Sequence, residues 1–553
     1  MDNSPRIALF LFFAAATAGI PAVTGSAAPA IRLNSLGFLP GRPKQATLTN
    51  DVTRFTLVRS ADGVEVFSGK VAGPITNADT GERLFAADFS AFTNAGTFQL
   101  DAPGAGRSAK FRIGDDVYRE PFRTVTRAMY LWRCGTAVSG THEAKTFAHA
   151  VCHTNDAWLD LVGGGLVRSN ANGGWHDAGD YNKYVVNAGV TIGCMFRAWE
   201  DFRPAIEKVR LDLPERGGRL PEFLAEIKWE LDWLLTMQAP DGSVYHKVST
   251  RDFGGFEMPE REGTPRYFAP WSSAATADFV AMLAAGARHF REFDPEYAAR
   301  CLAAAERSQQ FLTAHPENHR ADLTHFSTGT YQTRDDDDRL WALAELWAAT
   351  GNTNYLRDFE ARVRGRNQSF EAAWDWGNVR NLGLLAYLFS TREGRDASLV
   401  EAVRASVLAT ADNIVRTRNE HGYARPLGTA YSWGGNGTVA RQTLVLQAAY
   451  RISPKREYRE TSLDALGYLF GRNPFGRSFV TGLGDNPPHH PHDRRSGADQ
   501  VVEPWPGYLV GGPNPRATDW QDEEGDYRTN EIAINWNGAL IYALAGFLEE
   551  APR

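Results

Sequence analysis

The chain has 553 residues and a formal net charge of −7, with 23% charged and 43% hydrophobic residues. At ~100–200 residues per domain this length predicts two to four domains, although one large barrel would also absorb most of it. The mild acidity argues against a nucleic-acid partner, which requires a basic surface. Four Cys exclude a disulfide-dense scaffold, and 15 Trp are typical of a large core and of surfaces that stack on sugar rings.

The first segment, residues 1–28, has the pattern of a secretory signal peptide. Arg6 precedes an apolar run over residues 7–20, and small residues follow it. The run is shorter than the ~20 residues that cross a bilayer, and a buried N-terminal helix is the alternative interpretation. We expect cleavage within residues 24–30 and a secreted or periplasmic protein without a membrane anchor.

The next region, residues 29–115, is predicted to form a small β-sandwich. Short β-prone runs recur at ~10-residue spacing, and helical periodicity is absent. Ala61-Asp62-Gly63 lies between two such runs and predicts a hairpin turn. The runs cover residues 31–34, 46–48, 55–60, 64–71, 97–100 and 109–113.

The remaining region, residues 116–553, is dominated by amphipathic helices. Roughly a dozen segments carry apolar residues three and four positions apart, which fits a closed double ring of helices without proving closure. Residues 471–529 form the longest loop and are rich in aromatic residues, Pro and His, which is typical of a functional segment. Examples of the helices are residues 220–237, 272–293, 296–314, 336–350, 397–416, 439–450 and 530–549.

Two acidic motifs are candidates for catalysis. Asp177 and Asp180 lie in a Gly-rich turn before a predicted helix, and Glu531 follows Asn530 at the predicted start of the last helix. Glycosidic cleavage needs one carboxylic acid to protonate the leaving oxygen and a second carboxylate to activate water or to attack the sugar. Taken singly, each motif is also typical of a helix N-cap, and that alternative stays open at this point.

Three separated blocks together resemble glycoside hydrolase family 9, and they occur in that family's order. The resemblance covers roughly residues 31–550 and is strongest to the branch with an N-terminal immunoglobulin-like domain. It implies an immunoglobulin-like β-sandwich followed by an all-α (α/α)6 barrel with inverting cellulase activity. Gly538 departs from the family, which usually has a slightly larger small residue there. The blocks are Asp177-Ala178-Gly179-Asp180, Ser478 to Asn486 with Pro491 to Arg494, and Trp520 with Asp522, Tyr527, Glu531, Ala533 and Asn537.

The resemblance also implies roles for individual residues. Asp180 is expected to be the general base, Asp177 to help hold the attacking water, and Glu531 to be the general acid. The acid must stay protonated, which requires a raised pKa, and an inverting enzyme needs ~6.5–9.5 Å between acid and base. His492 and Arg494 are expected to bind the sugar at the cleavage site, because the family places its His two residues before the Arg.

A possible zinc site consists of Cys134, Cys152, His153 and His176. Two thiolates and two imidazoles are a typical structural zinc set. Spacing alone favours unrelated buried thiols and His residues, because no short paired Cys motif is present. The resembled branch carries zinc with these ligand types at matching positions, so we expect a structural zinc that would fix the loop bearing the two Asp residues.

A possible calcium site follows from the acidic run at residues 335–338. Four consecutive Asp at a helix start either interact with the helix dipole in solvent or supply oxygen ligands for calcium. The family has a structural calcium site in this region, with a further Asp after a later Trp. The expected ligands are Thr333, Asp337, Asp338 and Asp375, and the run leaves open which of its members coordinate.

Aromatic loops are the candidate sugar platforms. Trp433, Trp505 and Tyr527 either stack on pyranose faces or pack under the loops, and the two alternatives stay open. By the resemblance we expect a monomeric endo-β-1,4-glucanase that acts on cellulose or related β-glucans. The alternatives are an exo-acting member of the family, which releases glucose or glucosamine from chain ends, and a catalytically silent carbohydrate-binding protein. Intact Asp177, Asp180 and Glu531 argue against the silent protein.

Overall fold

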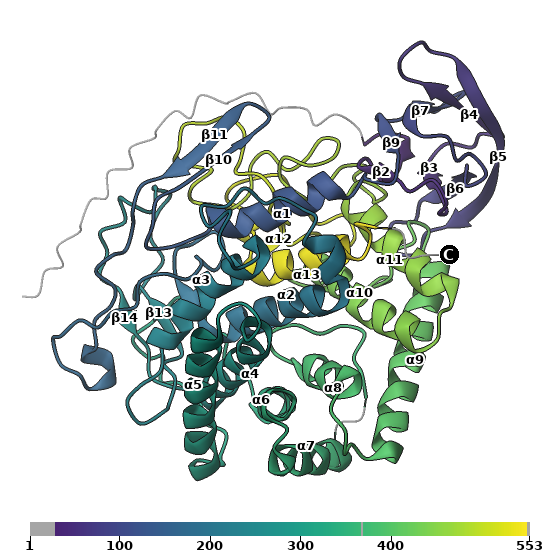
Figure 1. Cartoon of the computed structure of the whole chain (residues 1–553). Helices are drawn as coiled ribbons and strands as arrows, with labels where there is room; N and C mark the ends of the chain where they lie inside the picture. Colours follow the sequence, from purple (N-terminus) through teal and green to yellow (C-terminus); the bar gives the residue numbers. More distant parts are fainter. Residues whose placement is uncertain (1–27, 367–368, 550–553) are drawn as a thin grey trace, which may run out of the picture.

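The structure is a computed structural model that describes residues 28–366 and 369–549, so the predicted signal peptide (1–28) falls almost entirely outside the described residues. The described chain divides into an N-terminal all-β domain and a larger helical domain (Figure 1). In Figure 1 the strands of the first domain stand at the upper right, and the helices fill the remainder of the molecule.

The all-β domain is built from nine strands in the order β1-β3-β6-β5-β4-β7-β9-β2, with β8 on β7. Strand β5 belongs to two layers, since its first half pairs with β4 and its second half with β6, and the register of the β5–β6 pairing shifts near Gly73. Gly73 has a φ of +130°, which favours glycine. The bounds are β1 (Ile31–Arg32), β2 (Gly37–Phe38), β3 (Gln45–Leu48), β4 (Arg54–Arg59), β5 (Glu65–Thr76), β6 (Arg83–Asp88), β7 (Gly96–Ala102), β8 (Gly106–Arg107) and β9 (Phe111–Ile113).

Phenylalanine rings from both layers fill the core of this domain. Phe38 of β2 packs edge-on against Phe89 and Phe111, with ring centroids 5.1 and 5.4 Å apart. Such edge-to-face pairs add to the hydrophobic stabilisation of the core. The predicted hairpin turn is confirmed, because β4 ends and β5 begins around Gly63, whose N–H donates to the Arg59 carbonyl at 2.9 Å.

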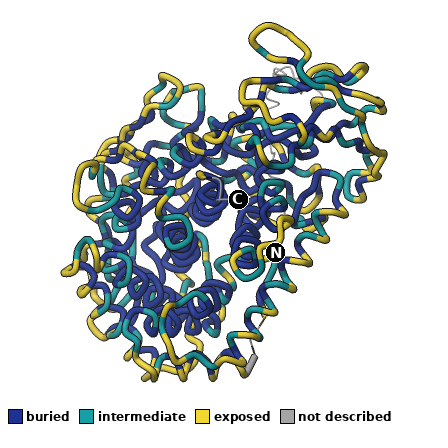
Figure 2. The backbone as a smooth tube through the Cα atoms, turned by 45° about the vertical axis from the view of Figure 1, so that its right-hand side comes forward, coloured by how far each residue is buried: buried dark blue, intermediate teal, exposed yellow. Residues whose placement is uncertain are grey.

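The helices of the second domain fall into two sets that differ in burial. Helices α2, α4, α6, α8, α10 and α13 are buried along most of their length, whereas α5, α7 and α9 expose one side. In Figure 2 buried helical turns lie inside the domain, and helices with exposed turns lie at its edge. A helix that is apolar all round must lie inside the domain, and an amphipathic one covers it. Accordingly α2 packs on α4 and α13, α4 on α6, α6 on α8 and α10 on α13, while α1, α5, α7, α9 and α11 cover them. The bounds are α1 (Arg119–Leu131), α2 (Val185–Ile206), α3 (Glu222–Thr236), α4 (Ser273–Phe290), α5 (Pro295–Ala314), α6 (Asp336–Thr350), α7 (Thr353–Arg366), α8 (Arg380–Phe389), α9 (Ala397–Glu420), α10 (Gly435–Ile452), α11 (Arg456–Leu469), α12 (Tyr527–Asn530) and α13 (Ile534–Ala545).

The predicted helices are confirmed with one exception at the C-terminal end. Residues 336–350 coincide with α6, and α3, α4, α5, α9 and α10 agree with their predictions to within a few residues. The prediction that the last helix starts at Asn530 is wrong. Asn530 ends the short helix α12, and Glu531 is extended, with φ −71° and ψ 156°. Glu531 pairs with His492 in a β-bridge, so a tertiary contact overrides the local capping pattern.

Long loops connect the helices and pair with one another. Residues 470–526 contain no helix, which confirms the long loop predicted there. β-Bridges join Val510 of this loop to Ile532, and Trp158 to Tyr267. The loops that precede α4 also carry the short elements β10 (Val138–His142), β11 (Lys145–His149), η1 (Asp160–Val162), β12 (Lys183–Tyr184), β13 (Lys247–Ser249) and β14 (Tyr267–Phe268).

The all-β domain contacts the loop between α9 and α10. Asp79 accepts hydrogen bonds from His421 Nε2, at 3.0 Å, and from the Tyr431 hydroxyl. Glu82 accepts a hydrogen bond from the Tyr423 hydroxyl at 2.6 Å. These polar contacts fix the 421–434 loop against the first domain.

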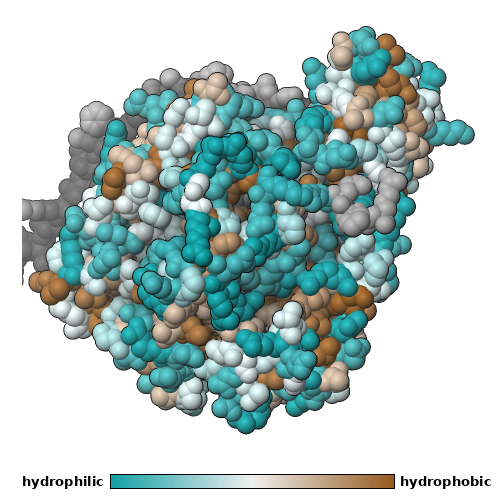
Figure 3. Space-filling model, in the orientation of Figure 1, coloured by the Kyte–Doolittle hydropathy of each residue, from teal (hydrophilic) through white to brown (hydrophobic). Residues whose placement is uncertain are grey.

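The surface is mostly hydrophilic. In Figure 3 hydrophobic side chains form small scattered groups on the face shown. Within residues 28–366 and 369–549, no helix combines the length and apolar character needed to cross a membrane.

Candidate active site

Three carboxylates from distant parts of the chain share one site. Asp177 and Asp180 lie in the loop before β12, and Glu531 lies between α12 and α13. The two segments are joined by the Ile534 N–H, which donates to the Asp177 carbonyl at 2.9 Å. Gly179 lies between the two Asp, and a Cβ there would meet the His492 carbonyl oxygen at 2.1 Å, so only glycine fits this close approach.

Asp177 is held by two hydrogen bonds. Its side chain is 1% exposed, and its Oδ1 and Oδ2 accept from Asn187 Nδ2 at 2.7 Å and from the Tyr331 hydroxyl at 2.8 Å. Burial, followed by repulsion from Asp180, raises the pKa of Asp177 to about 8. The N-cap interpretation is wrong, because Tyr184 is the N-cap of α2.

Asp180 has more freedom than Asp177. Asn182 Nδ2 donates to its Oδ2 at 2.5 Å, and no described residue donates to its Oδ1. Burial raises the pKa of Asp180, while the Arg494 guanidinium opposes that rise. One oxygen is therefore free to accept a hydrogen bond from water.

Glu531 is partly buried beside the two Asp. Burial, and then the charges of Asp180 and Asp177, raise the pKa of Glu531 well above its ordinary value. A carboxyl group in such surroundings keeps its proton at a pH where an ordinary glutamate has lost it. The site thus places a carboxyl group of raised pKa beside a second carboxyl group that has an oxygen free to accept a hydrogen bond.

His492 and Arg494 lie beside the carboxylates. The backbone carbonyl of Glu524 accepts a hydrogen bond from His492 Nδ1 at 2.7 Å, which leaves Nε2 as an available acceptor. The Arg494 N–H donates to the Gly179 carbonyl at 3.1 Å, and its guanidinium donates to Glu262 and to the Gly254 carbonyl, each at 3.1 Å. Both predicted binding residues therefore border the site.

Aromatic rings form a row along the same site. Phe256, His492, Tyr527 and Trp433 follow one another with centroid distances of 5.3, 6.0 and 5.7 Å. Trp433 and Tyr527 are 48% and 49% exposed, so their faces are open for stacking. Trp505 is buried and bonded through Nε1 to Asp499 at 2.8 Å, so the burial alternative holds for that residue.

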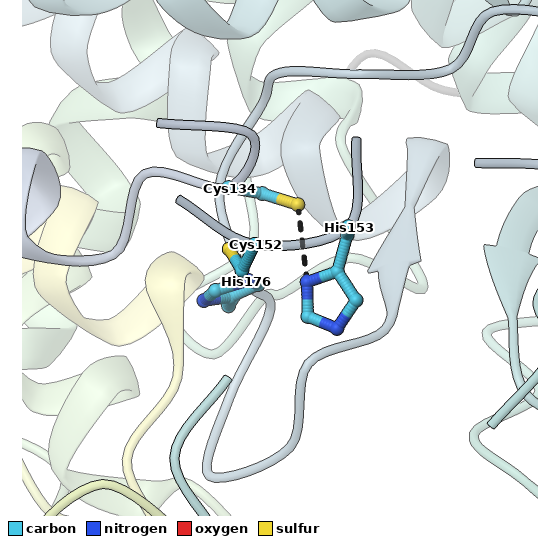
Figure 4. A group of neighbouring side chains, drawn as sticks. All are labelled: Cys134, Cys152, His153 and His176. Carbon is cyan, nitrogen blue, oxygen red and sulfur yellow. Dashed lines mark hydrogen bonds between the residues drawn. The ribbon is translucent and has the colours of Figure 1, made fainter. Parts of the chain in front are cut away.

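The predicted zinc ligands come together as a group. The ligand atoms of Cys134, Cys152, His153 and His176 all lie within 4.8 Å of one another. They come from the loop after α1, the loop after β11 and the loop before β12 (Figure 4). His153 Nδ1 is 3.6 Å from Cys134 Sγ, and His176 Nε2 is 3.8 Å from Cys152 Sγ.

The chemistry of this group fits a zinc ion. Burial opposes ionisation of Cys134, but a hydrogen bond from Cys152 and the charge of Lys183 hold its pKa well below the usual range. Burial also lowers the pKa of His176 to about 3, which keeps its imidazole neutral as a metal ligand must be. His176 Nδ1 is buried and has no hydrogen-bond partner. Two soft sulfur and two imidazole donors are a preferred tetrahedral zinc set.

Three of the four predicted calcium ligands are engaged by protein groups. Asp337 Oδ2 accepts a hydrogen bond from the Val379 N–H, and Thr333 Oγ1 donates to the Gly377 carbonyl at 3.1 Å. Asp375 accepts from Asn535 Nδ2 at 2.7 Å and pairs with the buried guanidinium of Arg441. Asp338 differs, because both of its carboxylate oxygens are buried without a hydrogen-bond partner among the described residues. Of the four predicted ligands, only Asp338 thus has two carboxylate oxygens that no protein group engages, and calcium here stays a prediction.

Comparison with known proteins identifies the family of this chain. Residues 118–544 match the sequence model of glycosyl hydrolase family 9, and residues 26–107 match that of the cellulase N-terminal ig-like domain. The chain belongs to glycosyl hydrolase family 9. Endoglucanase D of Acetivibrio thermocellus is 54% identical over 521 residues, which cover 94% of this chain and 83% of that protein.

Two further family 9 proteins are similar over nearly their whole length. A xyloglucan-specific endo-beta-1,4-glucanase of Bacteroides ovatus is 33% identical and covers 98% of each chain. The crystal structure of a metagenome-derived family 9 endoglucanase has a TM-score of 0.88 at 34% identity, covering 94% of this chain and 99% of that one. The expected family and the N-terminal immunoglobulin-like domain are therefore confirmed.

Sequence reasoning missed several residues of this family 9 site. Tyr331, Asn187 and Asn182 hold the two Asp residues, Phe256 extends the aromatic row, and Glu262 holds Arg494. Most come from separate loops and belong to no recognisable motif. Only Asn182 lies close to a motif, two positions after Asp180.

Proposed function

We propose that this chain is an endo-β-1,4-glucanase that cleaves internal bonds of cellulose or related β-glucans with inversion at the anomeric carbon. The observation that carries the proposal is the meeting of Asp177, Asp180 and Glu531 in a chain of glycosyl hydrolase family 9. The 54% identity to a protein named Endoglucanase D supports the endo mode and the β-glucan substrate.

Glu531 acts as the general acid in this proposal. Burial and the nearby negative charges raise its pKa, so it holds a proton for the leaving glycosidic oxygen. The two Asp charges both disfavour ionisation of Glu531, and the developing alkoxide of the leaving group receives that proton in the transition state.

Asp180 acts as the general base. Its Oδ1 has no donor among the described residues, whereas Asn182 orients the carboxylate through Oδ2. Asp177 helps to hold the attacking water, and its own position is fixed by Asn187 and Tyr331. Each carboxylate oxygen has two lone pairs, so Asp177 can still accept a hydrogen bond from that water.

Four residues bind the sugar in the same proposal. His492 Nε2 accepts a hydrogen bond from a hydroxyl group near the cleaved bond, and the Arg494 guanidinium donates to another. Tyr527 and Trp433 stack on pyranose faces, because both rings are about half exposed.

We also propose the finer architecture expected from the sequence. The helical domain is an (α/α)6 barrel in which α2, α4, α6, α8, α10 and α13 form the inner ring, which the burial of these helices supports. The domain limits are residues 29–115 for the sandwich and 116–553 for the barrel. The end of β9 at Ile113 and the start of α1 at Arg119 support this boundary.

A structural zinc completes the proposed site. Cys134, Cys152, His153 and His176 would hold it, and when bound it supplies a fixed cross-link between three loops. His176 directly precedes Asp177, so this cross-link preorganises the carboxylate loop. Calcium at Thr333, Asp337, Asp338 and Asp375 stays a prediction, as do secretion and a monomeric state, and no catalytic step depends on them.

The product profile tests the proposed function. With carboxymethylcellulose, an endo-acting enzyme lowers viscosity early, before many reducing ends appear, and cellopentaose yields oligosaccharides. Release of monosaccharide alone without a fall in viscosity would contradict the endo mode and favour the exo-acting alternative. Proton NMR of fresh products checks the stereochemistry, since inversion of a β-bond releases the α-anomer.

A further inference from the structure

Glu262 connects the metal-binding group to the sugar-binding arginine. Its side chain is 1% exposed and lies in the loop between β13 and β14. Its two oxygens have different partners: Oε2 lies 3.1 Å from His153 Nε2, and Oε1 accepts from Arg494 Nη1 at 3.1 Å. One carboxylate therefore joins two functional groups that the sequence gives no reason to connect.

On the metal side, Glu262 orients the imidazole of His153. His153 presents Nδ1 to Cys134 Sγ, so Nε2 carries the proton that Glu262 accepts when Nδ1 is a ligand. A carboxylate on the outer nitrogen of a ligating His fixes the ring orientation and raises its basicity. His176 has no such partner, because its outer nitrogen, Nδ1, is buried without a hydrogen bond. His153 also has a φ of +50°, an uncommon conformation for a residue other than glycine.

On the substrate side, Glu262 supplies the negative partner of a nearly buried guanidinium. Arg494 is 5% exposed, and its guanidinium also donates to the Gly254 carbonyl and lies over the Tyr181 ring. These neutral groups help to orient the guanidinium, but only Glu262 forms a salt bridge with it among the described residues. Removing one partner of a buried ion pair strongly disturbs the other, because the remaining charge is left uncompensated.

We propose that Glu262 is a positioning residue that couples metal binding at Cys134, Cys152, His153 and His176 to the orientation of Arg494 in the substrate cleft. The metal fixes the tautomer and orientation of His153, His153 fixes Glu262, and Glu262 fixes Arg494. The substrate half of this inference rests on the function proposed above, whereas the metal half rests on the contacts of Glu262 alone.

The test compares Glu262→Gln with Glu260→Gln, an exposed glutamate in the same loop. A glutamine cannot accept from both neighbours at once, because one of its terminal atoms is itself a donor. Competition with a chromophoric chelator should show ~10–100-fold weaker zinc binding for Glu262→Gln, and unchanged binding for Glu260→Gln.

Kinetics on a soluble β-glucan supply the second readout. In the wild-type chain, stripping the zinc should lower kcat/KM, mainly by raising KM as Arg494 loses its orientation. In Glu262→Gln, kcat/KM should already be low before zinc is removed. Removal of zinc should then lower kcat/KM much less than in wild type, because the coupling is broken. Glu262→Asp retains the charge on a shorter side chain, so its kcat/KM should lie between those of wild type and Glu262→Gln. This variant replaces Glu262→Gln in the test if the Gln variant does not fold.

Two results would overturn the coupling. The first is a folded Glu262 variant whose zinc affinity stays within about twofold of wild type, far below the ~10–100-fold that such contacts contribute. The second is an equal loss of kcat/KM on zinc removal in wild type and in Glu262→Gln. A wild-type chain without β-glucanase activity would instead refute the proposed function, and the chelator competition would still decide the metal half.

Discussion

Two regions of this molecule assemble charged side chains in opposite ways. Asp177, Asp180 and Glu531 come from loops far apart in sequence and meet in one site, as do the four Cys and His side chains beside them. The acidic run at the start of α6 is continuous in sequence, yet its side chains separate. Asp337 bonds to the Val379 N–H, Asp338 is buried without a hydrogen-bond partner in the described part of the chain, and the half-exposed Asp336 pairs with Arg334.

The difference teaches that contiguity in sequence is a poor guide to a site. On a helix, consecutive side chains point in directions about 100° apart, so a run of four acids spreads around the axis. Loops that pair through β-bridges bring single residues into one place and hold them there. We call the three carboxylates and the four Cys and His side chains the convergent region. The predictions below test whether activity and metal binding depend on this region and not on the acidic run.

The largest effect is expected from Glu531→Gln in the convergent region. Loss of the general acid should lower kcat about 100- to 10,000-fold on a soluble β-glucan, while the thermal unfolding temperature stays close to that of wild type. The comparison variant is Asp336→Asn in the acidic run, which should retain full activity. Normal turnover by a folded Glu531→Gln variant would contradict the assignment of Glu531 as the general acid.

The next effect is expected from Cys152→Ser, which removes one sulfur from the metal-binding group. Zinc measured by elemental analysis should fall from about one equivalent to near zero. The free energy of unfolding should fall by about 4 kcal/mol if free zinc stands 1,000-fold above its Kd. Cys301→Ala, in helix α5 away from this group, should leave the zinc content unchanged. Wild-type protein with less than half an equivalent of zinc would speak against the site.

A smaller and pH-dependent effect is expected from Asp338→Asn. Burial, and then repulsion from Asp278, raise the pKa of Asp338 well above its ordinary value, so the folded chain binds a proton that the unfolded chain releases. Stability therefore falls as pH rises from the ordinary pKa towards the folded one, by about 1.4 kcal/mol per pH unit while the unfolded group alone is ionised.

The Asn variant should lose this dependence and gain stability relative to wild type at pH 8, with little difference at pH 4. Urea unfolding at both pH values measures the effect. A calcium ion bound by Asp338 would reverse the result: the variant would be less stable in calcium buffer, and added calcium would no longer raise its unfolding temperature.

Much of the fold follows from local patterns, whereas the site depends on contacts between distant segments. The helical periodicity of residues 336–350 predicted α6 to the residue, and Ala61-Asp62-Gly63 predicted the turn between β4 and β5. Glu531 shows the limit, since Asn530-Glu531 has the composition of a helix start. Its bridge with His492 holds it extended, and no local signal reports that pairing.

The residues that hold the candidate catalytic and sugar-binding side chains also could not be predicted from the sequence. Tyr331, which donates to Asp177, has a φ of +41° in a loop without a motif, and Glu262 lies more than two hundred positions before Arg494. A single Tyr or Glu carries no periodicity that could single it out. The sequence motifs identify the groups that perform the chemistry, and the residues that hold them become visible only in three dimensions.

The contact between Asp79 and Tyr431 has a practical consequence for anyone who wishes to engineer this chain. Trp433, an open ring of the aromatic row, stands two positions after Tyr431, whose hydroxyl is anchored on the first domain. The boundary after residue 115 is thus an unsafe place to cut. A truncated helical domain would retain Asp177, Asp180 and Glu531 but lose the Asp79 contact that anchors the loop bearing Trp433.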